Sequence, residues 1–171
     1  ITTLQPKAKK VGIMYTTSEA NSVSNLKRFE EVAKDSNIDV VSQGVQTAAD
    51  IPQAAASLCS KVDCINNFTD NNVVNNLTTL LEQANANNIP VYGSEEEQVT
   101  NGCLASVSID YVALGKTTGE MAVKILNGEE AANMEVLQIK DATPVINEDV
   151  LNKFGIELPE KYKNATMLNS K

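Results

Sequence analysis

Short apolar runs recur along the chain, and each of them ends in a polar turn. Five runs of this kind occupy residues 11–15, 38–42, 62–68, 89–92 and 104–109. Continuous apolar runs of this length are typical of strands that are buried on both faces of a sheet. The pattern therefore predicts five strands.

Segments with apolar residues at helical spacing lie between these runs. They predict helices at residues 23–34, 54–59, 73–84 and 112–126. Asp50 is a candidate cap for the second helix, with Pro52 in its first turn. Strands thus alternate with helices from residue 11 to residue 126. This alternation predicts an α/β fold, a doubly wound parallel sheet with helices on both faces.

The pattern weakens after the helix at 112–126. Residues 136–139 favour a further strand and residues 148–154 a short helix, and the polar residues after 159 are expected to form a loose tail. Small residues along one side of the long helix either favour close packing against other backbone or are simply tolerated. They are Gly115, Gly119 and Ala122.

The bulk properties narrow the class of protein. A length of 171 residues with 42% hydrophobic residues suits one globular domain, and no apolar run approaches the ~20 residues of a membrane span. The net charge of −8 argues against nucleic acid or an anionic membrane as a partner. The first residue is Ile1 and no signal-like segment follows, which predicts a processed or excised piece.

The metal-binding residue types are scarce. The chain has no histidine, and its three cysteines lack C-x-x-C spacing, so a zinc site is not expected. The cysteines are predicted to be buried as small apolar residues. We predict neither a metal nor another cofactor.

Candidate chemistry lies in four polar turns, at residues 16–22, 69–71, 93–97 and 110–111. Each follows the carboxyl end of a predicted strand, and in a parallel sheet such turns converge on the edge where ligands bind. The turns contain hydroxyls, amides and carboxylates but no lysine or arginine. The only arginine, Arg28, lies further along the first helix.

These turns suit binding better than catalysis. They contain neither histidine nor cysteine, and the chain has no G-x-G-x-x-G or G-x-x-x-x-G-K-[ST] motif. Glu19 and Asp70 faintly suggest a receiver-type phosphorylation domain, but the lysine expected after its fifth strand is missing. Helix N-termini after the first and third strands can hold a carboxylate, and Asp70, Glu95 and Asp110 can hold an ammonium group. A zwitterionic amino acid matches this mixture.

Each of these residues also has a purely structural interpretation. Asp70 and Asp110 could be plain helix caps, as could Ser18 and Asn21, and the acidic run at 95–97 could be a solvated surface. Several polar turns of one kind on one predicted edge favour the ligand site over these alternatives.

Five segments, in order along the chain, resemble a known family. They are Y-T-T-S-E-A-N-S (15–22), T-D-N (69–71), I-P-V-Y-G-S-E-E (89–96), N-G-C-L-A (101–105) and I-D-Y-V-A-L-G-K-T-T-G-E-M-A (109–122). Together they resemble the ABC-transporter substrate-binding proteins of the tryptophan/tyrosine type, which look like type I periplasmic binding proteins. The resemblance extends from about residue 6 to residue 162 and covers only the later part of that family's chain.

The resemblance implies one flavodoxin-like lobe of a two-lobed protein that closes on an aromatic or related amino acid and delivers it to a membrane permease. Residues 8–110 would form this second lobe, 111–128 a crossover helix of the missing first lobe, 129–162 a return segment and 163–171 a tail. A lipoprotein signal would precede the first lobe, and the protein would work outside the cytoplasm. The motif positions facing the cleft are Ser18, Glu19, Asn21, Thr69, Asp70, Ser94, Glu95 and Asp110.

Two alternative functions stay open. One is a doubly wound enzyme with Asp70 or Glu95 as an acid–base group, and the other is a ligand-sensing regulatory domain of the same ancestry. For the chain without a first lobe, we also expect the helix at 112–126 to expose apolar surface. It would fold back on its own lobe or, as we favour, associate with a second copy.

Overall fold

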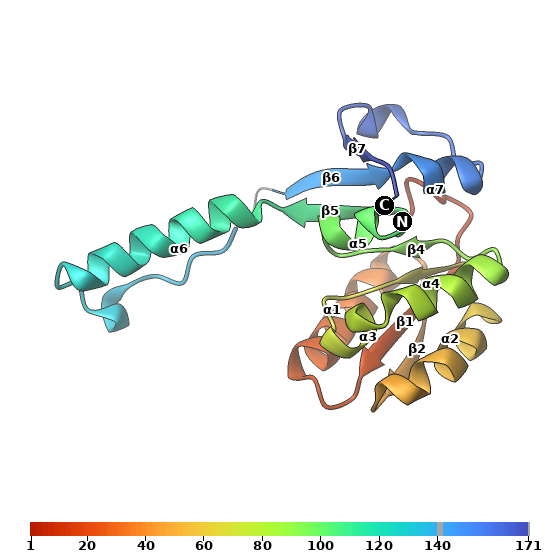
Figure 1. Cartoon of the computed structure of the whole chain (residues 1–171), viewed down its shortest axis with the longest axis horizontal. Coiled ribbons are helices and arrows are strands. Elements are labelled where there is room, and N and C mark those ends of the chain that lie inside the picture. The colour runs from red at the N-terminus through yellow and green to blue at the C-terminus, as the bar shows by residue number, and fades with distance from the viewer. Residues whose placement is uncertain (140–141, 171) are drawn as a thin grey trace.

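Parallel strands form the centre of the lobe in the computed structural model, which describes residues 1–139 and 142–170 (Figure 1). The strand order is β2-β1-β3-β4, with β1 (Lys10–Thr16) paired to β2 (Asp39–Val45) on one side and to β3 (Cys64–Asn66) on the other. β3 pairs in turn with β4 (Val91–Tyr92). Because consecutive strands are placed on both sides of β1, the sheet is doubly wound, and the predicted α/β fold class is confirmed.

Helices cover both faces of this sheet. α1 (Ala20–Asp35) contributes Leu26 to the cluster that contains Val11 and Ile13 of β1. α2 (Ile51–Cys59), preceded by the 3-10 turn η1 (Ala48–Asp50), and α4 (Leu77–Ala86) share a second cluster with Met14. Since neighbouring residues of a strand point to opposite faces, α1 lies on one face and α2 and α4 lie on the other.

The helix predicted at 73–84 is two helices in the structure. α3 (Asn71–Asn75) is followed by Asn76, whose φ of −118° and ψ of 24° are not helical, and α4 begins at the next residue. The Asn76 side chain donates to the carbonyl oxygen of Asn72 at 2.8 Å. Asparagine side chains compete with the helix for backbone partners in this way, which apolar spacing alone does not reveal.

The fifth predicted strand belongs to a second, mixed sheet. β5 (Ala105–Ile109) adjoins β4 through the amide of Leu104 and the carbonyl oxygen of Val91, at 2.6 Å. It pairs antiparallel with β6 (Ala142–Asn147), which pairs in parallel with β7 (Thr166–Leu168).

The C-terminal predictions need correction. The strand predicted at 136–139 is wrong, because these residues form no strand and Val136 and Leu137 are exposed. The tail expected to be loose contains β7, which β6 holds by backbone pairing. α7 (Glu148–Lys153) agrees with the predicted short helix, whereas α5 (Glu96–Thr100) falls where a turn was predicted. Two 3-10 turns complete the elements, η2 (Ala131–Asn133) and η3 (Glu160–Tyr162).

α6 (Tyr111–Leu126) projects away from the lobe (Figure 1). None of its residues is buried, and space is open around Gly115 and Gly119, so the helix has not folded back. We call residues 111–139 the arm. It carries most of the exposed large apolar side chains among the described residues: Tyr111, Val112, Val123, Ile125, Leu126, Val136 and Leu137. No helix in the described part of the chain has the length and apolar character to span a bilayer.

Candidate functional site

Asp70 joins the end of β1 to the start of α3. Its side chain is fully buried and accepts hydrogen bonds from the backbone nitrogen of Thr16 at 2.6 Å, the Thr16 hydroxyl at 2.7 Å and the backbone nitrogen of Val73 at 3.0 Å. Burial raises the pKa of Asp70, but the nearby Ser22 hydroxyl and the hydrogen bonds from Thr16 and Val73 outweigh this, and the pKa lies below its usual value. Both carboxylate oxygens accept hydrogen bonds, so Asp70 fixes the end of β1 to the start of α3.

Glu19 and Asn21 tie the loop after β1 to the loop after β3. The Glu19 carboxylate accepts from the backbone nitrogen of Asn71 at 3.1 Å and from that of Asn72 at 3.3 Å. The Asn21 amide donates to the carbonyl oxygen of Thr69 at 3.3 Å. The structure therefore brings together the two turns that the sequence predicted to converge, with Ser18 exposed beside them.

The N-terminus of α1 is open at this edge. Glu19 occupies the cap position, but its side chain turns to α3 and makes no capping hydrogen bond to α1. The first N–H groups of a helix have no partner within the helix, and a 16-residue helix adds its dipole to them. Such a terminus is suited to a carboxylate.

A buried amide network fixes the turn after β4. The Ser94 hydroxyl donates to the carbonyl oxygen of Asn67 at 2.7 Å, and the Asn67 amide donates to the side-chain oxygen of Gln98 at 3.0 Å. Gln98 in turn donates to the carbonyl oxygen of Phe68 at 3.3 Å and to the Glu95 carboxylate at 3.4 Å. Ser94 and Glu95, both half-buried, are thereby held beside the loop after β3.

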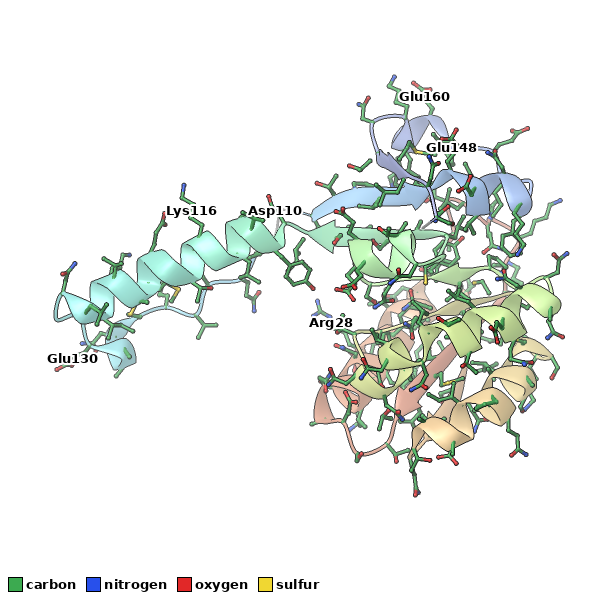
Figure 2. The ribbon with its side chains drawn as sticks, viewed as in Figure 1. Arg28, Asp110, Lys116, Glu130, Glu148 and Glu160 are labelled. Carbon is green, nitrogen blue, oxygen red and sulfur yellow. The ribbon has the colours of Figure 1, made fainter. Side chains whose placement is uncertain are left out.

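Asp110 lies where α6 leaves the lobe (Figure 2). It is exposed and caps α6, accepting from the backbone nitrogen of Val112 at 2.8 Å and that of Ala113 at 3.0 Å. Asp110 and Glu95 line one hollow, together with Glu96 and Glu97. Asp70 and Asp110 are therefore helix caps, which is the structural role that the sequence left open for them. The acidic run at 95–97 forms the start of α5.

Thr69 and Ser94 line a different hollow, of about 480 Å³, between α1 and β5. Sequence reasoning missed its other side chains, notably Arg28, Phe29 and Tyr111. Among the described residues, no carboxylate lies within 4.0 Å of the Arg28 guanidinium, which points out from the lobe on the side where α6 leaves (Figure 2). Positions 25, 28, 29 and 32 of α1 all line this hollow. Their helical spacing is the signal that could have placed Arg28 on this face.

The described residues contain no group of three or more histidine, cysteine or acidic side chains placed to hold a metal ion. The cysteines Cys59, Cys64 and Cys103 are free and buried, as the sequence predicted. Within the described structure, this edge offers carboxylates, hydroxyls, amides, a helix N-terminus and, in the hollow beside Thr69 and Ser94, the Arg28 guanidinium.

Known proteins and solved structures are similar to this chain. The tyrosine-binding protein of Clostridioides difficile is 38% identical over 157 residues, which cover 92% of this chain and 46% of that protein. A ligand-free, open structure of a substrate-binding protein with adhesive properties from Clostridium difficile is 38% identical, with a TM-score of 0.80 over 99% of this chain and 57% of that one. A Streptococcus pneumonia ABC domain in complex with L-Trp is 31% identical, with a TM-score of 0.91 over 98% and 57% of the two chains.

The chain thus spans about half the length of the relatives it matches. The pattern of the ABC transporter substrate binding protein family matches residues 1–167, which is nearly the whole sequence. The predicted resemblance is confirmed: the chain belongs to the family of ABC transporter substrate-binding proteins.

Proposed function

We propose that this chain is one lobe of the extracytoplasmic solute-binding component of an ABC importer, and that it binds an aromatic or related amino acid. The observation that carries the proposal is its similarity, at 38% and 31% identity, to a tyrosine-binding protein and to a domain crystallised with L-Trp. The ligand would lie at the carboxyl edge of the sheet, in a cleft closed by a second lobe.

The polar edge supports this ligand chemistry. We assign the carboxylate of the amino acid to the open N-terminus of α1, with hydroxyls from Ser18 and Thr69 beside it. The ammonium group is on the same carbon as that carboxylate, so it would lie toward Glu95, which Gln98 holds beside the loop after β3, and Asp110 would line the neighbouring hollow. Ser94 and Asn21 would complete the polar contacts, and Glu19 and Asp70 would hold the two loops in place.

The surroundings of Asp70 support binding rather than catalysis at this residue. A general acid needs a pKa near the working pH and a free proton path to the substrate. The pKa of Asp70 is lowered and both of its oxygens are engaged within the protein, so the enzyme alternative is weakened at this residue.

The arm supports a second lobe as the partner. Val112 and Leu126 are exposed, and soluble proteins rarely leave large patches of such apolar side chains exposed to solvent. The solved relatives match this chain over only 57% of their own length, so they have the residues to cover such a surface. We propose that α6 packs in the first lobe and that the permease receives the closed protein. In a chain without that lobe, the same face favours association with a second copy.

A screen of the twenty L-amino acids tests the ligand class. Each is added at several millimolar to the purified chain, and the melting temperature and the mass spectrum of the amino acid are recorded. We expect tyrosine or tryptophan to raise the melting temperature most, by linkage of binding to folding, and to be recovered unchanged. Stabilisation by none of the aromatic amino acids, or conversion of any amino acid, would contradict the proposal.

A further inference from the structure

Gln98 is the buried polar residue of α5, with only 1% of its surface exposed. Its side-chain oxygen accepts from the Asn67 amide at 3.0 Å and from the backbone nitrogen of Ser94 at 3.4 Å. Its side-chain nitrogen donates to the carbonyl oxygen of Phe68 at 3.3 Å and to the Glu95 carboxylate at 3.4 Å. A carboxylate at this position could only accept hydrogen bonds, so two donors and two acceptors around one side chain require an amide.

α5 itself is held by the second sheet. The Ser108 hydroxyl of β5 accepts from the backbone nitrogen of Glu96 at 3.2 Å, and the Asn147 amide of β6 donates to the carbonyl oxygen of Val99 at 2.8 Å. The side chain of Gln98 therefore projects from a helix that two strands fix in place. Its amide carries that position to the turn after β4 and to the loop after β3.

The turn after β4 leaves room for the Gln98 side chain. Gly93 directly follows β4, and a Cβ atom added there would lie 2.9 Å from the Cβ atom of Gln98 and 3.2 Å from its side-chain oxygen. Carbon atoms pack best at about 3.5–4.0 Å, so a side chain at position 93 would push the Gln98 amide away from its partners. The glycine and the amide therefore form one structural unit.

We propose that Gln98 is a positioning residue that gives the site its preference for ligands with a free ammonium group. Gln98 acts through Glu95, whose carboxylate it holds beside the loop after β3. The ammonium and the carboxylate of an amino acid are attached to one carbon, so Glu95 meets the first only at a set distance from the α1 N-terminus, which takes the second. The inference rests on the proposed function, because it concerns the same ligand.

L-Tryptophan and indole-3-propionate differ only in the ammonium group, so the ratio of their dissociation constants measures this preference. Both are titrated into the ¹⁵N-labelled 171-residue chain, with amide chemical shifts as the readout. We expect the native chain to bind L-tryptophan about tenfold more tightly than indole-3-propionate. Gln98→Met keeps the length of the side chain but removes the amide. The ratio should then fall to about twofold, because only the binding of L-tryptophan is weakened.

Three further variants connect this effect to its cause. Glu95→Gln should lower the ratio to a similar value, and adding Gln98→Met to it should change the ratio by less than about twofold, because both substitutions remove one interaction. Gly93→Ala displaces the Gln98 amide without changing its chemistry, so it should lower the ratio as well, and it decides the test if Gln98→Met does not fold. Gln53→Met, on the exposed side of α2, is the matched control and should leave both affinities unchanged.

A positioning role and a merely structural role predict different results. An unchanged ratio in Gln98→Met or in Gly93→Ala, an equal loss of affinity for both compounds, or independent effects of Gln98→Met and Glu95→Gln would overturn the inference. So would equal affinity of the native chain for the two compounds. The proposed function would survive each of these results, because the native chain would still bind L-tryptophan. Binding of neither compound by the native chain would overturn the proposed function, and this inference with it.

Discussion

Replacing Asp70 with alanine is expected to destabilise the lobe by about 3 kcal/mol. The variant loses a helix cap, worth about 1 kcal/mol, and leaves the Thr16 amide and hydroxyl without their buried partner. An unpaired buried donor costs about 1–3 kcal/mol, so the loss at Thr16 dominates. Chemical denaturation of the purified chain measures the change in unfolding free energy.

Asp110→Ala is the matched control, because Asp110 also caps a helix but is exposed and binds no distant element. We expect a loss of at most about 1 kcal/mol, confined to fraying of α6. Similar losses for both variants would show that the link between β1 and α3 does not stabilise the lobe.

The stabilisation by Asp70 should depend on pH. The pKa of Asp70 is lowered in the folded state, so the folded protein favours the ionised form. The contribution is fully present above the unfolded pKa of about 3.9 and is lost as the pH falls through the lower folded value. The difference in stability between the native protein and Asp70→Ala should therefore shrink as the pH falls below about 4.

Leu80→Ala is expected to cost about 3 kcal/mol, whereas Leu126→Ala should cost close to nothing. Leu80 is fully buried on α4 against the α2 face of the sheet, and removing a buried leucine leaves a cavity. Leu126 is 84% exposed at the end of α6, so the same substitution removes no packing. Melting temperatures of the two variants provide the comparison.

This pair tests whether the arm belongs to the core of this lobe. A stability loss of more than about 1 kcal/mol for Leu126→Ala would mean that α6 is packed in solution, against the lobe or against a second copy. Light scattering of the same sample would separate these two cases, since only the second changes the mass.

The sequence predicted the elements whose signal is local. Val11 and Ile13 lie in a continuous apolar run, and that run is the central strand β1. The polar turns after β1 and β3 meet because parallel strands place their carboxyl ends on one edge, which depends on topology rather than on details of packing.

The predictions that failed depend on tertiary contacts. β6 contains Pro144 and only two large apolar residues, Val145 and Ile146, so an apolar pattern does not reveal its pairing with β5. Val136 belongs to a pattern typical of a strand but is exposed. Arg28 was set aside because it is distant in sequence from the turns, although the hollow that contains it also contains Thr69. Asp70 faces the predicted edge, but only its three partners reveal that it is buried.

Amide chemical shifts of the ¹⁵N-labelled chain during titration with L-tyrosine and L-tryptophan test the central claim most directly. One lobe alone lacks part of the ligand's contacts, so an affinity on the order of millimolar, or about −4 kcal/mol, is expected. The shifts should concentrate at Ser18, Asn21, Thr69, Ser94 and Glu95. An absence of shifts at these amides at about 10 mM ligand, or shifts confined to other parts of the lobe, would contradict the assignment of this edge as an aromatic amino-acid site.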